Sequence, residues 1–168
     1  IKIEKSKVHA ITQLSKPKTP KQVRSFIGMI QYLSRFLPRL NISLITLYDL
    51  TKKTVPFKWT DKHQEIFEKL KKAVTTAPAV SLPTRTGIYI LEIDSSREGT
   101  WAVLKQMQNG TERVIAFNSK KLSNAAQNYS VSELELTGIL INLQCFKTLL
   151  GNRHFYVTTD HKSLLGLL

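Results

Sequence analysis

The 168-residue chain has only one cysteine, Cys145, so it can form no internal disulfide bond. It also lacks an apolar run near the ~18 residues that a membrane span needs, and its first residues lack the long apolar segment of a signal peptide. These absences exclude a disulfide-stapled scaffold and a membrane-spanning protein, and they favour an intracellular, reducing setting. Because Cys145 lies in an apolar stretch, we expect it in the core.

Acidic residues are scarce as well. The chain has 12 Asp and Glu against 25 Lys and Arg, which gives a net charge of +13. The excess of positive charge is greatest in residues 1–24, which contain seven basic residues and only one acidic residue, Glu4. A large positive charge on a small chain indicates a polyanionic partner such as nucleic acid. The alternative is a basic surface that serves solubility only.

No Gly-rich phosphate loop and no Ser-His-Asp spacing of a hydrolase triad are present. The pattern from Thr19 to about Thr76 is instead typical of helices, with apolar residues at helical spacing. Three residues are expected to cap these helices at their N-termini: Thr19, Asn41 and Thr60. The Thr- and Pro-rich stretch at 75–87 breaks the helical pattern, and we place a domain boundary between residues 77 and 78.

Residues 78–168 are typical of an α/β domain. Strands are predicted at 88–94, 100–106, 112–119 and 154–160, with an Asn109-Gly110 hairpin and a long helix between Ser130 and Gly151. The order of three strands, a helix and a fourth strand requires the helix to cross over the sheet. It most simply makes the fourth strand parallel to the first. The predicted fold class is therefore α/β with a mixed sheet, preceded by a small helical subdomain.

Three carboxylates of this domain could meet. Asp94 ends the first predicted strand and Asp160 ends the fourth, so both would emerge at the same carboxyl edge of the sheet. The long helix offers either Glu133 or Glu135, which point to different sides because they are two residues apart. Glu135 shares its side of the helix with apolar residues and is expected to face the sheet. Glu133 is expected to face water.

Converging carboxylates form a hard oxygen-donor site for Mg²⁺ or Mn²⁺, and with a polyanionic substrate they suit two-metal phosphodiester hydrolysis. Each acid also has an ordinary structural role. Asp94 could start a turn, Glu135 could favour the helix N-terminus, and Asp160 could cap a further helix. The spacing alone leaves both interpretations open.

Four segments, taken in their order along the chain, carry a family resemblance: "TPKQVRSFIGMIQYLSRFLP", "LEIDSSREGTWAVL", "VIAFNSKKLSNAAQNYSVSELEL" and "GNRHFYVTTDHKSL". Together they resemble the Pol polyprotein of LTR retrotransposons of the Ty3/gypsy type and of their retroviral relatives. The resemblance implies a reverse transcriptase thumb-like region over 1–77 and a ribonuclease H-like domain over 78–168. It also implies hydrolysis of RNA in RNA–DNA hybrids, with Mg²⁺ or Mn²⁺ held by Asp94, Glu135 and Asp160 as the catalytic acids.

The thumb of this family packs a helix into the minor groove of the primer–template. Arg24, Gly28 and Tyr32 lie on one helical face and match that track, with Arg24 reaching phosphate, Gly28 admitting the backbone and Tyr32 lying against sugar. The alternative is a helix-packing glycine beside an interfacial tyrosine. His161 follows Asp160 directly and is a further candidate for contact with substrate phosphate, or else a surface histidine.

Some features depart from the family. The first acid stands in "DSS" where the family has "DAS", and Trp101 stands where relatives have a second glycine. The polymerase palm is not expected in these residues, and the chain is expected to stop before the family's last strand, helix and fourth carboxylate.

The resemblance also implies partners and a location. The expected partners are an RNA–DNA hybrid or a primer–template duplex and the remainder of the Pol polyprotein, without a membrane. The implied location is the cytoplasm, a virus-like particle or the nucleus. A competing interpretation is a non-catalytic nucleic-acid-binding module, of connection type or domesticated, and a third is a scaffold for protein contacts.

Overall fold

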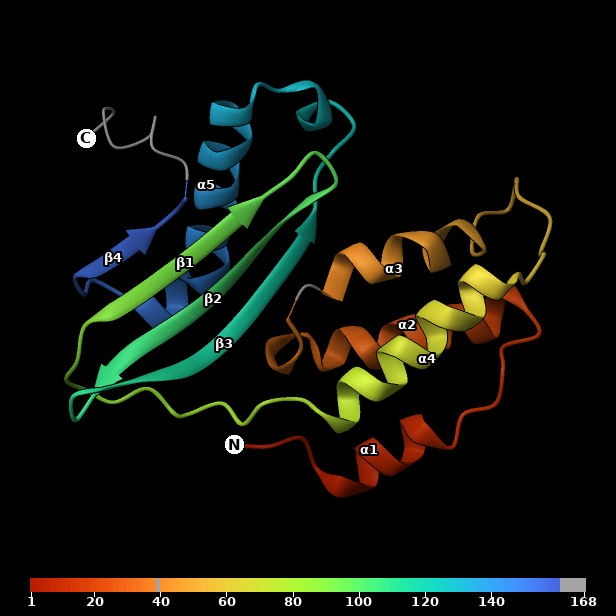
Figure 1. Cartoon of the computed structure of the whole chain (residues 1–168), viewed down its shortest axis with the longest axis horizontal. Helices are drawn as coiled ribbons and strands as arrows, with labels where there is room; N and C mark the ends of the chain where they lie inside the picture. The colour runs from red at the N-terminus through yellow and green to blue at the C-terminus, as the bar shows by residue number, and fades with distance from the viewer. Residues whose placement is uncertain (39, 161–168) are drawn as a thin grey trace. The chain divides into compact units, whose positions relative to one another are not determined.

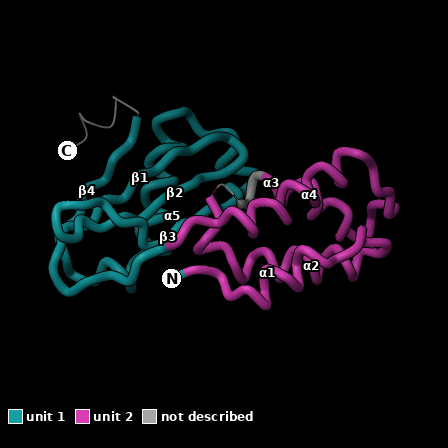
Figure 2. The backbone as a smooth tube through the Cα atoms, turned by 60° about the horizontal axis from the view of Figure 1, so that its bottom comes forward, with its two compact units in different colours: residues 1, 80–168 teal, residues 2–79 magenta. Residues whose placement is uncertain are grey.

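The computed structural model describes residues 1–38 and 40–160. The chain divides into two compact units, a helical unit over residues 2–79 and a sheet unit formed by residue 1 and residues 80–168 (Figure 2). None of the described helices combines the length and the apolar character that crossing a membrane would require.

Across its described residues, the helical unit contains four α-helices and a short 3₁₀ turn. They are α1 (Lys5–Thr12), α2 (Pro20–Tyr32), η1 (Ser34–Phe36), α3 (Leu40–Asp49) and α4 (Asp61–Thr75). The core between them holds the rings of Phe26 and Phe67, whose centroids lie 4.7 Å apart. Helix α1 was not predicted, because it buries only Ile11 and so has little amphipathic pattern.

Local capping explains where two of these helices begin. The side chain of Thr19 accepts a hydrogen bond from the backbone N–H of Gln22 at 3.2 Å. At the start of α4, Nδ1 of His63 accepts a hydrogen bond from the backbone N–H of Thr60 at 3.0 Å. The predicted caps at Thr19 and Thr60 are therefore confirmed. The predicted cap at Asn41 is wrong, because α3 already begins at Leu40.

The sheet unit follows the predicted order of elements (Figure 1). These elements are β1 (Tyr89–Ser95), β2 (Gly99–Gln108), β3 (Thr111–Lys121), η2 (Ala126–Asn128), α5 (Val131–Leu150) and β4 (Phe155–Thr158). The strands are arranged in the order β3-β2-β1-β4, with β1 antiparallel to β2 and parallel to β4. The predicted parallel pairing of the first and fourth strands is thus confirmed.

Helix α5 lies across one face of this sheet (Figure 1). Tyr89, Leu91 and Ile93 alternate along β1 and form a core with Phe146 and Leu150 of α5. The next residue on that face of β1 is the last one of the strand, so the beginning of α5 meets the carboxyl end of β1.

Turn chemistry fixes the ends of these elements. Asn109 and Gly110 both have positive φ, of 51° and 74°, as a two-residue type I′ hairpin requires. Ser130 caps α5 at its start, and Gly151 follows its last residue with φ of 56°. The predicted hairpin and helix boundaries are confirmed.

Candidate active site and nucleic-acid face

Asp94 and Asp160 lie at the same edge of the sheet. The parallel pairing of β1 with β4 ends where Glu92 faces Thr158, and two residues further along each segment are Asp94 and Asp160. Both acids are exposed. Asp160 was predicted to end the fourth strand, but β4 stops at Thr158, so this acid lies in a bend beyond it.

Glu135 reaches the same end of β1 from α5. It is only 4% exposed, and its Oε1 accepts a hydrogen bond from the backbone N–H of Ser95 at 3.3 Å. Because Ser95 directly follows Asp94, the hydrogen bond brings the Glu135 carboxylate to the residue after the first acid. Glu135 thus faces the sheet, as its place on the helix predicted.

Glu133 has a different role. Its side chain is exposed and accepts hydrogen bonds from the backbone N–H of Ser130 at 2.8 Å and from its hydroxyl at 2.7 Å. These bonds from Ser130 lower the pKa of Glu133. Glu133 therefore completes the N-terminal cap of α5 and faces water, as predicted.

Trp101 lies beside Asp94. The two residues face each other in the antiparallel pairing of β1 with β2, so their side chains are neighbours on one face of the sheet. Side chains alternate along a strand, which puts Ser95 on the opposite face with α5. The Trp101 indole thus stands next to the first acid.

The donors at this edge are carboxylate oxygens, the ligands that Mg²⁺ and Mn²⁺ prefer. Within residues 1–38 and 40–160, however, no group of three or more His, Cys, Asp or Glu side chains is arranged to hold a metal ion. The structure therefore places Asp94 and Asp160 at one sheet edge and Glu135 at the end of β1. It does not draw the three carboxylates into one cluster.

A buried polar network beneath this edge was missed by the sequence reasoning. It links Ser95 of β1, Thr100 of β2, Asn118 of β3 and Asn142 of α5. A signal was present, because Asn142 follows Glu135 by seven residues and shares its apolar side of the helix. A polar side chain at such a position needs buried partners.

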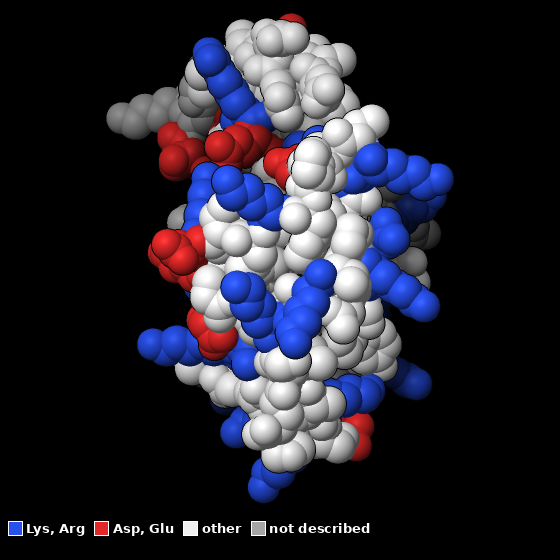
Figure 3. Space-filling view, turned by 90° about the vertical axis from the view of Figure 1, so that its right-hand side faces the viewer, with Lys and Arg blue, Asp and Glu red and all other residues white. Residues whose placement is uncertain are grey.

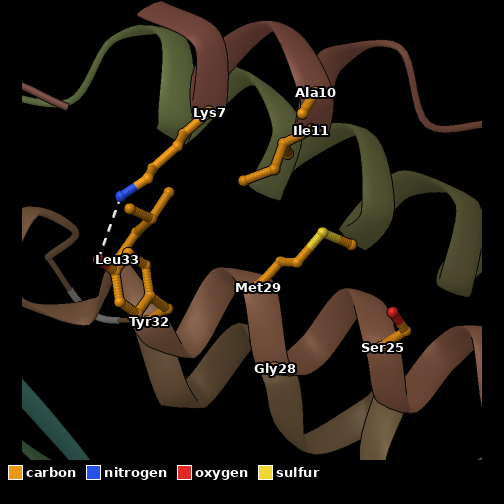
Figure 4. Close-up of a pocket in the computed structure, with 8 residues that line it drawn as sticks. All are labelled: Lys7, Ala10, Ile11, Ser25, Gly28, Met29, Tyr32 and Leu33. Carbon is orange, nitrogen blue, oxygen red and sulfur yellow. Dashed lines mark hydrogen bonds between the residues drawn. The ribbon is translucent and has the colours of Figure 1, made fainter. Parts of the chain in front are cut away.

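The helical unit carries an open groove of about 480 Å³ between α1 and α2. Its lining residues are Lys7, Ala10, Ile11, Ser25, Gly28, Met29, Tyr32 and Leu33. In Figure 4, Lys7 and Tyr32 meet at one end, and the side chains of Ile11 and Met29 point into the space between the helices. Lys7 Nζ donates a hydrogen bond to the Tyr32 hydroxyl at 3.1 Å and lies 4.7 Å from its ring centroid. That hydrogen bond raises the pKa of Lys7.

The predicted nucleic-acid residues are only partly brought together. Gly28 and Tyr32 line the groove, and Tyr32 is 70% exposed. Apart from its chain neighbours and the backbone of its own helix, no described atom lies within 4 Å of where a Cβ of Gly28 would stand, so packing against other elements of the unit does not require this glycine. Arg24 is exposed too, but its guanidinium donates to the Thr51 carbonyl at 3.1 Å rather than lining the groove. His161 lies outside the described residues.

The positive charge belongs mainly to the helical unit. Residues 2–79 hold 16 of the 25 Lys and Arg but 5 of the 12 Asp and Glu, which is +11 of the net +13. On the face shown in Figure 3, Lys and Arg side chains are spread over the surface and Asp and Glu form a few separate groups. A polyanion would therefore be attracted chiefly to this unit.

Comparisons with known proteins identify relatives of the chain. A model of the family described as "RNase H-like domain found in reverse transcriptase" matches residues 59–157. The Tf2-3 and Tf2-4 transposon polyproteins of Schizosaccharomyces pombe are each 30% identical over 162 residues, which cover 95% of this chain and 12% of each polyprotein. The chain thus matches a small part of these curated relatives.

Two solved structures share the fold. A foamy viral protease–reverse transcriptase described as "dRH", in complex with double-stranded DNA, has a TM-score of 0.81 at 18% identity, covering 99% of this chain and 30% of that one. A foamy viral protease–reverse transcriptase in complex with an RNA/DNA hybrid has a TM-score of 0.79 at 19% identity, covering 96% of this chain and 22% of that one. The predicted ribonuclease H-like α/β fold and the resemblance to retroelement Pol polyproteins are confirmed. The chain belongs to the family of RNase H-like domains found in reverse transcriptases.

Proposed function

We propose that this chain is the ribonuclease H-like part of a retroelement reverse transcriptase whose parent protein hydrolyses the RNA strand of RNA–DNA hybrids. The observation that carries the proposal is the hydrogen bond from Ser95 N–H to Glu135, which holds a buried carboxylate at the residue after Asp94. Asp160 emerges from the neighbouring parallel strand at the same edge. A relative in fold that was solved with an RNA/DNA hybrid supports the substrate class.

Asp94, Glu135 and Asp160 are the residues that would hold Mg²⁺ or Mn²⁺. When bound there, the ion would supply charge stabilisation at the scissile phosphate and activation of the attacking water. The carboxylate of Glu135 is fixed in direction by its hydrogen bond and its burial. Asp94 and Asp160 are exposed, so they remain accessible to a bulky nucleic acid.

The helical unit would bind the duplex as a thumb-like region over residues 1–77. Gly28 leaves open space through which a sugar–phosphate backbone can approach α2, and Tyr32 offers an exposed ring to the sugars. Lys7 lies at the same end of the groove and adds a cation for phosphate. Arg24 would have to leave the Thr51 carbonyl to join them, which costs little at an exposed site.

A second candidate is a non-catalytic nucleic-acid-binding module. It is favoured by the concentration of +11 in residues 2–79. It is also favoured by the finding that the described carboxylates do not form a three-residue metal cluster. In this case the duplex would bind to the helical unit, and the acids of the sheet unit would have structural roles only.

One experiment separates these functions. The 168-residue chain is incubated with an RNA–DNA hybrid labelled on the RNA strand, with and without Mg²⁺, and both retention and cleavage are measured over a salt series. Asp94→Asn removes one carboxylate charge with little change in shape. Glu133→Gln is the matched control, because it also removes one carboxylate charge near the start of α5, but from an exposed side chain that faces water.

Cleavage that requires Mg²⁺, is lost in Asp94→Asn and persists in Glu133→Gln would support the nuclease. Binding that weakens steeply with salt and is never followed by cleavage would refute it for this chain and support the binding module. If the hybrid is neither bound nor cut, both proposals are wrong.

A further inference from the structure

We propose that Asn142 is a positioning residue, which holds α5 close to β1 and β2 so that the Glu135 carboxylate stays against the Ser95 N–H. The importance of that carboxylate rests on the proposed function. The coupling between Asn142 and the position of Glu135 does not rest on that function, because it follows from contacts among residues of the sheet unit alone.

Asn142 is completely buried and joins three elements. Its Nδ2 donates to Thr100 Oγ1 on β2 at 2.9 Å and to the Gly138 carbonyl on α5 at 2.8 Å. Its Oδ1 accepts from Asn118 Nδ2 on β3 at 2.7 Å. A buried amide with these directional partners fixes one height of the helix above the sheet, which an apolar side chain of similar size would not.

Gly138 shows how closely the helix approaches. A Cβ at this position would stand 2.0 Å from Ser95 Oγ and 2.8 Å from Thr100 Oγ1, so only glycine fits without movement. Ser95 Oγ in turn donates to Thr100 Oγ1 at 3.1 Å. The hydroxyl that distinguishes "DSS" from the family's "DAS" therefore occupies the space that the glycine leaves open.

These contacts converge on Ser95. Its hydroxyl belongs to the network that Asn142 completes, and its backbone N–H donates to Glu135 Oε1 at 3.3 Å. Glu135 and Asn142 are seven residues apart on one rigid helix, close to two full turns, so they face the sheet together. If α5 rises at Asn142 and Gly138, the Glu135 carboxylate, about one turn before Gly138, moves away from Ser95.

The test uses two variants that weaken the network in different ways. Asn142→Ala removes the amide, and Thr100→Val removes the central hydroxyl while keeping the side-chain volume. Gln144→Ala is the matched control, because it truncates an exposed amide on the same helix. Hydrogen exchange of the Ser95 amide is measured by NMR on the metal-free protein, and Mg²⁺ affinity is measured by titration.

In Asn142→Ala and Thr100→Val, we expect exchange of the Ser95 amide to accelerate about fivefold or more relative to the amide of Leu91, the loss that one weakened hydrogen bond produces. We also expect the Mg²⁺ dissociation constant to rise about tenfold or more, as for other residues that orient a metal ligand. Gln144→Ala should change neither quantity.

If the variants lose overall stability while the Ser95 amide exchanges at the same rate relative to Leu91, the network only packs the core and the inference is wrong. If the unchanged protein binds no Mg²⁺, the proposed metal chemistry fails, and the exchange rates of the metal-free protein still decide whether Asn142 positions Glu135.

Discussion

Replacing Gly138 by alanine should destabilise the sheet unit, although alanine favours helices. The new methyl group would lie 2.0 Å from Ser95 Oγ and 2.8 Å from Thr100 Oγ1. Overpacking of this kind costs about 1–3 kcal/mol, and displacing the Ser95 hydroxyl from Thr100 costs about 1 kcal/mol more. Against this, alanine gains about 1 kcal/mol of helix propensity over glycine. The net expectation is a loss of about 1–3 kcal/mol in the free energy of unfolding.

Ser95→Ala should partly rescue this loss. The substitution removes the nearest obstructing atom, so the double variant should be at least about 1 kcal/mol more stable than the sum of the two single effects, a coupling typical of residues in contact. Gly28→Ala provides the matched control. It is also a helical glycine but has open space around it, so it should stabilise the helical unit by about 1 kcal/mol.

Urea unfolding followed by tryptophan fluorescence measures these effects unit by unit. The chain has two tryptophans, Trp59 in the helical unit and Trp101 in the sheet unit. Replacing one tryptophan by phenylalanine leaves the other as the fluorescence reporter of its own unit. The unfolding of the two units is then not treated as a single transition. If Gly138→Ala is as stabilising as Gly28→Ala, or if Ser95→Ala and Gly138→Ala are additive, the close approach of α5 is refuted.

Three further predictions concern charge. Lys7→Met should weaken duplex binding and reduce the dependence of log affinity on log salt by about one, while the exposed Lys53→Met should have less effect. Burial lowers the pKa of His63, and its Nδ1 can accept its capping hydrogen bond only when neutral. The helical unit should therefore keep its full stability above the ordinary histidine pKa of about 6.5 and lose part of it as pH falls through the lower folded-state pKa. Trp59, whose ring centroid lies 5.7 Å from that of His63, reports this loss, and His63→Gln should abolish the pH dependence. The lowered pKa of Glu133 stabilises the sheet unit above the ordinary glutamate pKa of about 4.3, and the contribution is lost as pH falls through the folded-state pKa. A Glu133→Gln variant that unfolds with the same acid dependence as the unchanged protein would contradict this.

Local chemistry made much of the sheet unit predictable. The Asn109-Gly110 turn and the caps at Ser130 and Gly151 depend on neighbouring residues only, and each is where the sequence indicated. The choice of Glu135 over Glu133 was also predictable, because helical periodicity decides which of two nearby residues faces the sheet.

Other features depend on distances that a sequence does not contain. The roles of Gly138 and Asn142 follow from how near α5 comes to β1 and β2, and a periodicity argument gives the side of a helix but not its height. Cys145 was expected in the core, but it is exposed, because apolar residues occur on more than one side of α5 and only one side meets the sheet. Asp160 lies beyond β4 because strand ends are set by pairing with β1, which stops at Glu92.

The central proposal is that Asp94, Glu135 and Asp160, which do not form a cluster in the described structure, come together at one metal site when the ion binds. The most direct measurement is the paramagnetic broadening of side-chain carboxyl NMR signals as Mn²⁺ is added to the chain. We predict that the signals of these three acids broaden together at the lowest Mn²⁺ concentrations, while that of Glu133 broadens only at much higher ones. Broadening of Glu133 in parallel with the three acids, or of only one of the three, would contradict the account.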